Sequence, residues 1–140
     1  IFPIKTANRI RKHQEPWSVN TLAQFAGVAA LEDDKYRERS IKVVSEKKKL
    51  LEAGFKRLNI NYIPSCANYF LFSTPYAKKI IQFLNKKNIL VRNCSNFKGL
   101  DSTYIRVAVK TGKQNNLLIK YIEEWLEDGV GISFHKIFNI

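Results

Sequence analysis

Residues 89–110 read ILVRNCSNFKGLDSTYIRVAVK, two short apolar runs joined by a polar loop. The apolar runs are typical of β-strands, and the Asn, Ser, Gly and Asp residues between them are typical of turns. Each run carries one arginine, Arg92 in the first and Arg106 in the second. Because arginine is rarely buried without a partner, each guanidinium group is expected to face an anion, either in the protein or on a ligand.

Side chains alternate between the two faces of a strand, so the predicted strand 104–109 has an apolar face and a mixed face. The apolar face carries Ile105, Val107 and Val109, and the mixed face carries Tyr104, Arg106 and Ala108. A planar guanidinium on the mixed face can hold a carboxylate through two parallel hydrogen bonds. A surface salt bridge to one of the chain's own acids is the alternative. Arg92 ends the neighbouring predicted strand 89–92, where it can hold a second anionic group such as a phosphate.

The segments before this stretch have helical and strand patterns. Residues 4–14 favour a helix, and Pro16 follows its end. The segment PWSVN is then expected to form a hinge, with Ser18 capping a helix over 21–32. Further elements are predicted as a helix over 35–58 capped by Asp33 or Asp34, a strand over 62–73, a helix over 76–87 and a helix over 114–127. This order predicts an α+β fold, a small, mostly antiparallel sheet with helices packed on one face.

Composition limits the classes of protein that fit. A chain of 140 residues with 45% hydrophobic residues suits one globular domain. No apolar run approaches the roughly 20 residues that span a bilayer, so we expect no membrane partner. The net charge of +12 permits a nucleic acid or another polyanion as partner, but the lysines are scattered, which favours a solvated surface. The chain contains no methionine, so we expect a piece of a longer protein.

Few other residues indicate chemistry. Asn68 interrupts an apolar strand, where it can contact a ligand or bond to adjacent backbone. His13 and His135 lack a surrounding set of Cys, Asp or Glu residues, and Cys66 and Cys94 lack metal-like spacing, so we predict no metal site. The sequence shows no glycine-rich phosphate loop and no nucleophile elbow. The residues alone therefore predict an α+β domain with a two-arginine anion site.

Three segments together resemble a known family. They are PWSVN with the Ala-rich helix after it, ANYFLF at 67–72, and the stretch from Arg92 to Ala108. They resemble the C-terminal part of the pyridoxal-phosphate-dependent aminotransferases of class I and II. Within that group the stretch is most similar to the threonine-phosphate decarboxylases of cobalamin biosynthesis, and the histidinol-phosphate aminotransferases are near relatives. The resemblance runs from about residue 5 to about residue 127.

The resemblance implies roles for four residues. It implies that Arg106 binds the substrate α-carboxylate, that Arg92 binds the substrate phosphate, and that Asn20 and Asn68 lie near the site. The implied reaction is the decarboxylation of O-phosphothreonine to an aminopropanol phosphate, with pyridoxal phosphate as the cofactor of the full-length parent. Holding the carboxylate helps to select which bond breaks, which is positioning rather than acid–base chemistry. The implied parent is a cytoplasmic homodimer.

The chain departs from the family in one decisive respect. The family's cofactor lysine lies in a Ser/Thr-Lys motif upstream of PWSVN, and Lys5 and Lys12 do not fit that motif. We therefore expect no catalytic or cofactor-binding residue in this chain, no bound cofactor and no activity of the chain alone. The expected organisation is a helix at 1–16 leading in from a missing large domain, an aminotransferase-like small domain at 17–128, and a tail of unknown origin at 129–140.

Two alternatives stay open. The arginines alone do not separate threonine phosphate from histidinol phosphate, although the loop NCSNFKGLD favours threonine phosphate. In a different class, a polyanion- or RNA-binding module is permitted by the net charge and by the sheet aromatics Tyr69 and Phe72. The absence of an RNP-like aromatic motif argues against that module.

Overall fold

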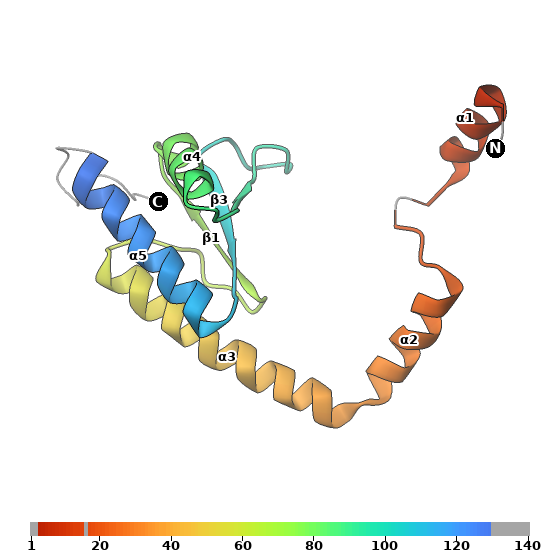
Figure 1. Cartoon of the computed structure of the whole chain (residues 1–140), viewed down its shortest axis with the longest axis horizontal. Helices are drawn as coiled ribbons and strands as arrows, with labels where there is room; N and C mark the ends of the chain where they lie inside the picture. Colours follow the sequence, from red (N-terminus) through yellow and green to blue (C-terminus); the bar gives the residue numbers. More distant parts are fainter. Residues whose placement is uncertain (1–2, 16, 130–140) are drawn as a thin grey trace. The chain divides into compact units, whose positions relative to one another are not determined.

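A computed structural model describes residues 3–15 and 17–129 of the chain. In these residues the chain forms five α-helices and a three-stranded sheet (Figure 1). The helices are α1 Ile4–His13, α2 Thr21–Glu32, α3 Asp34–Arg57, α4 Ala77–Lys86 and α5 Gly112–Gly129. The strands are β1 Tyr69–Ser73, β2 Arg92–Asn93 and β3 Tyr104–Ala108. The predicted α+β class is confirmed, and no described helix combines the length and apolarity needed to cross a bilayer.

The chain divides into two compact units, Ile1–Arg39 and Ser40–Ile140, and the division falls within α3. In the first unit, α2 begins at the predicted residue, but its cap is Asn20 rather than Ser18. Asn20 Oδ1 accepts a hydrogen bond from Ala23 N at 2.9 Å, and it does so because it immediately precedes the first helical residue. Ser18 lies two residues too early for this contact. The helix predicted over 4–14 is observed as α1, which ends at His13, and Pro16 lies outside the described residues.

The helices of the first unit bury no described side chain. α2 carries no charged residue before Glu32, and large apolar side chains cover it. They are Leu22, Phe25, Val28 and Leu31, each more than half exposed. A helix that is apolar all round is normally buried, so the surface of α2 has the composition of a buried contact face.

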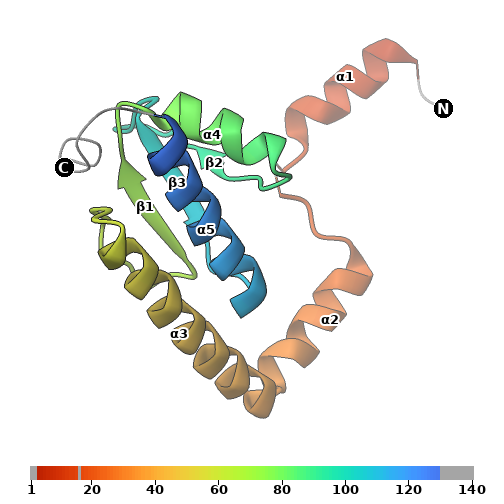
Figure 2. The same ribbon diagram turned by 60° about the vertical axis from the view of Figure 1, so that its left-hand side comes forward.

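The sheet of the second unit has the order β1-β3-β2, and both pairings are antiparallel. Its apolar face is buried through Phe70, Phe72, Ile105 and Val107. α3, α4 and α5 pack against this face (Figure 2). The predicted alternation along 104–109 is confirmed, because Ile105 and Val107 are buried whereas Arg106 is half-buried and Ala108 is exposed. Helices on one side therefore leave the mixed face of the sheet open.

Aromatic rings form the centre of this core. The Phe55 ring of α3 lies 5.4 Å from the Phe70 ring, edge to face, and 5.9 Å from the Phe72 ring. Tyr62 closes the cluster, with its ring 5.1 Å from that of Phe70. Edge-to-face pairs of this kind stabilise a core by about 0.5–1.5 kcal/mol beyond the area that they bury. The cluster holds β1 against the C-terminal half of α3.

Two predicted strands are longer than the observed ones. The strand predicted over 62–73 begins only at Tyr69, and the earlier part forms a single bridge between Ile63 and Leu71. Pro64 lacks an N–H for a ladder, which explains why pairing does not continue there. The strand predicted over 89–92 is observed only as Arg92–Asn93, and residues 88–91 instead line a hollow of about 390 Å³ together with the end of β3 and the start of α5.

α3 and α5 approach each other closely at Gly54. A Cβ atom added at Gly54 would lie 2.6 Å from Ile119 Cγ1 and 2.7 Å from Ile119 Cδ1. Both distances are shorter than a normal van der Waals contact, and Ile119 is itself buried. Glycine at this position is therefore required by packing rather than by backbone conformation.

We predict that Gly54→Ala destabilises the chain by about 1 kcal/mol, because an overpacking cost of about 1–3 kcal/mol exceeds the gain in helix propensity of at most about 1 kcal/mol. Urea denaturation followed by circular dichroism measures the change. In the background of Ile119→Ala, which removes the obstructing atoms, Gly54→Ala should be neutral or stabilising. An equal cost in both backgrounds would show that Ile119 is not the obstacle.

Candidate anion-binding site

Arg92 and Arg106 are directly opposite each other on neighbouring strands. The antiparallel register pairs Arg92 of β2 with Arg106 of β3. Cys94 N donates to Tyr104 O at 3.1 Å two residues further along, which fixes the ladder beside the pair. Opposite residues in an antiparallel pair point to the same face of the sheet. The structure thus brings the two predicted site arginines together on the open face.

Neither arginine is paired with a carboxylate among the described residues 3–15 and 17–129. The ion pairs found there join Arg37 with Asp34, Arg57 with Glu123 and Lys87 with Glu124. Arg92 Nη2 instead donates to Asn96 Oδ1 at 3.0 Å. In the described part of the chain, neither arginine therefore forms the alternative, a surface salt bridge to one of the protein's own acids.

Aromatic rings flank the two guanidinium groups. Arg106 Cζ lies 5.0 Å from the centre of the Tyr69 ring and 5.8 Å from the centre of the Phe97 ring. Arg92 Cζ lies 5.7 Å from the same Phe97 ring. Each such contact contributes about 0.5–1 kcal/mol at an exposed position. The sequence alone did not assign Phe97 or Asn96 to the site. Their position in the loop between the two arginines was the only sequence feature that pointed to them.

The pair carries an electrostatic cost in the absence of a ligand. Like charges directly opposite each other in a sheet are destabilising. Burial raises the pKa of the nearby Cys94 thiol, and the positive charges of Arg106 and Arg92 act against that rise. Both cysteines are free thiols, Cys94 buried and Cys66 exposed. An anion placed between the arginines would relieve the repulsion between them. The arrangement is therefore suited to binding an anion.

The loop between β2 and β3 is held by short-range hydrogen bonds. Asp101 Oδ1 accepts from Thr103 N at 2.8 Å and from the Thr103 hydroxyl, and these bonds lower the pKa of Asp101. The Thr103 hydroxyl also lies 2.9 Å from that of Ser73, which ties the loop to β1. Gly99 has φ of +85°, a conformation that other residues rarely adopt. The loop residues therefore hold a defined geometry next to the arginines.

Asn68 and Asn20 were the other predicted site residues. Asn68 precedes β1, and its carbonyl accepts from Val109 N at 2.8 Å. Asn68 also lines a hollow of about 430 Å³, together with Lys48 and Cys66 of the same unit. Asn20 lies in the first unit, where its side chain caps α2. The ligand role of both asparagines stays a prediction.

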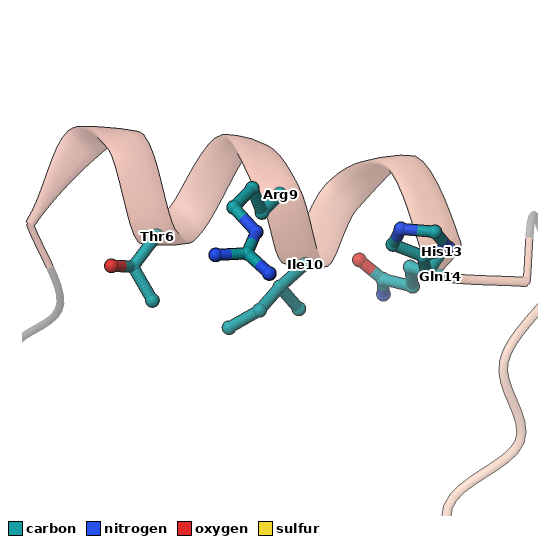
Figure 3. Close-up of a pocket in the computed structure, with 5 residues that line it drawn as sticks. All are labelled: Thr6, Arg9, Ile10, His13 and Gln14. Carbon is teal, nitrogen blue, oxygen red and sulfur yellow. The ribbon is translucent and has the colours of Figure 1, made fainter.

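A further open hollow lies beside α1 (Figure 3). Its lining residues are Thr6, Arg9, Ile10, His13 and Gln14. The first four lie on α1 and Gln14 directly follows it, and neither Lys5 nor Lys12 is among them. Ile4 precedes Lys5 and Arg11 precedes Lys12, so neither lysine lies in a Ser/Thr-Lys motif. Among the described residues, no three His, Cys, Asp or Glu side chains gather as metal ligands.

The sequence matches the family described as aminotransferase class I and II over residues 5–122. This span covers most of the chain and includes both arginines and the loop between them. The chain belongs to this family. The match starts where the resemblance was expected to start and ends a few residues before the expected residue 127.

Individual relatives include two kinds of enzyme. The chain is 38% identical to a histidinol-phosphate aminotransferase of Symbiobacterium thermophilum, over 83% of this chain and 32% of the relative. It is 35% identical to a threonine-phosphate decarboxylase of Salmonella typhimurium, over 79% of this chain and 31% of the relative. The chain thus spans about a third of the length of the curated relatives that it matches.

Solved structures give the same two kinds of neighbour. The histidinol-phosphate aminotransferase of Clostridium acetobutylicum superposes with a TM-score of 0.71 at 26% identity, covering 90% of this chain and 39% of that one. The L-threonine-O-3-phosphate decarboxylase of Porphyromonas gingivalis superposes with a TM-score of 0.63 at 28% identity, covering 89% and 39%. These likenesses agree with the predicted fold of an aminotransferase small domain.

We predict that Thr103→Val raises the pKa of Asp101 toward its ordinary value of 3.8, because valine removes the hydroxyl donor and leaves only the backbone N–H. The carboxylate is favoured in the folded state, so the stabilisation by this contact is present above the ordinary pKa and is lost as the pH falls through the lowered one. Carbon-detected NMR titration of the Asp101 carboxyl measures the shift, and Ser102→Ala serves as the neighbouring control. An unchanged Asp101 pKa in Thr103→Val would contradict the assignment.

Proposed function

We propose that this chain supplies the substrate-anion site of a pyridoxal-phosphate-dependent enzyme that acts on O-phosphothreonine. The observation that carries the proposal is the pair of arginines placed opposite each other on the open face of the sheet. Neither has a carboxylate partner in the described residues, and both are held by aromatic or amide contacts that leave their charge uncompensated. Membership in the aminotransferase class I and II family supports this assignment.

The two arginines have separate roles in the proposal. Arg106 binds the α-carboxylate, for which the planar guanidinium offers two parallel donors. Arg92, at the edge strand and beside the polar loop, binds the phosphate. Together they orient the bond that breaks, and this chain contributes position rather than proton transfer. Asn68 and Asn20 are proposed to lie near the site or in its walls.

The cofactor belongs, in this proposal, to the rest of the parent protein. The lysines of α1 do not lie in the family's Ser/Thr-Lys motif, and the chain spans about a third of the length of its curated relatives. We therefore propose that the chain alone is inactive and that a large domain outside residues 1–140 holds the cofactor. The exposed apolar residues of α2 support this arrangement, because a helix of that composition is normally buried. The parent is proposed to act as a cytoplasmic homodimer.

Histidinol phosphate is the second substrate to consider, because relatives that act on it match the chain as well. The sequence analysis expected that the arginines would not distinguish the two compounds. The compounds differ, however, in the anionic groups that they offer to the arginines. O-phosphothreonine carries both a carboxylate and a phosphate, whereas histidinol phosphate carries a phosphate and no carboxylate. An aminotransferase must also bind an amino acid or a 2-oxo acid, whose carboxylate could use Arg106. Turnover of each compound by the full-length parent therefore separates the two hypotheses.

We predict that Arg106→Gln weakens binding of O-phosphothreonine by about 10- to 100-fold, which is the range for losing hydrogen bonds between charged groups. The same substitution should leave binding of 1-aminopropan-2-ol phosphate unchanged, because that compound lacks the carboxylate. Arg92→Gln should weaken both. Titrations of the 140-residue chain followed by NMR at low ionic strength measure these affinities.

Lys113→Gln is the matched control, because it removes one exposed positive charge from the start of α5. If it weakens binding as much as Arg106→Gln does, net charge rather than a site explains the binding. Salt-dependent binding of generic RNA that depends on the lysine clusters and not on Arg106 would favour the polyanion-binding module instead. Equal effects of Arg106→Gln on both phosphorylated compounds would contradict the carboxylate role.

A further inference from the structure

Phe97 contacts both arginines of the site with a single ring. The ring centre lies 5.7 Å from Arg92 Cζ and 5.8 Å from Arg106 Cζ. No other ring in the described residues is placed within such a distance of both guanidinium groups. The Phe97 side chain is 41% exposed, so it is not held there by burial in the core. Its location therefore calls for an explanation other than packing.

Hydrogen bonds of the loop hold the backbone at Phe97. Phe97 N donates to Cys94 O at 3.0 Å, and Leu100 N donates to Phe97 O at 3.1 Å. Phe97 thus stands at the junction of two successive turns, with its N–H and its C=O both engaged. Ser95 N donates to Asn93 Oδ1 at 2.9 Å and tightens the first turn. The backbone from which the ring projects is therefore held by the loop, independently of the arginines.

The arginines, by contrast, have little else to hold them. Arg92 has one side-chain hydrogen bond, to Asn96, and Arg106 lies over the Tyr69 ring. Their mutual repulsion would drive two long side chains apart into solvent, and each loses rotamer entropy when a ligand orders it. A ring that attracts both cations opposes that separation. Fixing a binding group in advance lowers the entropic cost of binding.

We propose that Phe97 is a positioning residue that holds Arg92 and Arg106 at a fixed separation, so that the site selects ligands with two anionic groups over ligands with one. The inference rests on the proposed function of the arginines and adds a cause for the spacing between them. A ligand with a single anionic group engages one guanidinium and gains little from the fixed separation. A ligand with two such groups gains from both being ordered at once.

The first test observes the arginines without any ligand. The Nε–H signals of Arg92 and Arg106 in the free chain should show ring-current shifts and restricted motion in heteronuclear NOE measurements. Phe97→Leu, which keeps apolar volume but removes the ring, should abolish the Phe97 shift at both arginines and increase the motion of both side chains. Phe97→Trp should restore the restricted motion. Unaltered arginine motion in Phe97→Leu would overturn the inference.

The second test uses O-phosphothreonine as the probe, with inorganic phosphate as the ligand with one anionic group. Phe97→Leu should weaken O-phosphothreonine binding about three- to tenfold and change phosphate binding by less than twofold, and Phe97→Trp should restore the affinity. Phe83→Leu is the matched control, because Phe83 also lies under a cation, Lys87, at 5.3 Å, but on α4.

The outcomes separate the two proposals. If Arg106→Gln and Arg92→Gln abolish binding while Phe97→Leu has no effect, the proposed function stands and the role of Phe97 is overturned. If the arginine substitutions have no effect either, the proposed function fails as well. Equal weakening of phosphate and O-phosphothreonine by Phe97→Leu would also overturn the inference, because it would indicate a general disturbance of the loop.

Discussion

The structure depends on the register that β3 imposes on its two neighbours. β3 is the central strand, and its pairing with β1 puts Phe70 opposite Val107 and Phe72 opposite Ile105 on the buried face. A slip of one residue would send Arg106 into that core, at a cost far larger than any pairing could offset. Burial of the apolar face therefore fixes the position of Arg106. Because β2 pairs with β3 through Arg92 opposite Arg106, the same register sets the arginines side by side.

The remaining elements of the second unit support that register. The close approach of Gly54 to Ile119 brings α3 against α5, and the Phe55 ring joins α3 to β1. Short hydrogen-bonded turns hold the loop that connects β2 to β3, and Asp101 and Thr103 close it before β3 begins. A rigid sheet with a fixed loop can keep the two arginines on neighbouring strands, which a flexible segment could not do. The two-arginine site on the open face is thus a consequence of packing on the buried face of the sheet.

Much of this arrangement was predictable from local pattern. The alternation of Ile105, Arg106 and Val107 identified the faces of β3, and the helices were found with boundaries close to the observed ones. The sequence pattern indicated Ser18 as the cap of α2, and only the backbone shows that Asn20 immediately precedes the first turn. The strand predicted before Tyr69 failed because pairing needs a neighbour, and Pro64 offers no donor. The role of Phe97 required the three-dimensional distances, since its neighbours along the chain do not indicate what its ring contacts.

The central claim is that two guanidinium groups are held opposite each other to share one doubly anionic ligand. A double-mutant cycle of Arg92→Gln and Arg106→Gln, measured by urea denaturation in phosphate-free buffer, tests it most directly. The account predicts a repulsive coupling of a few tenths to about 1 kcal/mol at low salt, which shrinks as salt is added and becomes attractive with O-phosphothreonine present. No coupling in the free chain, or a coupling that O-phosphothreonine does not change, would contradict the account.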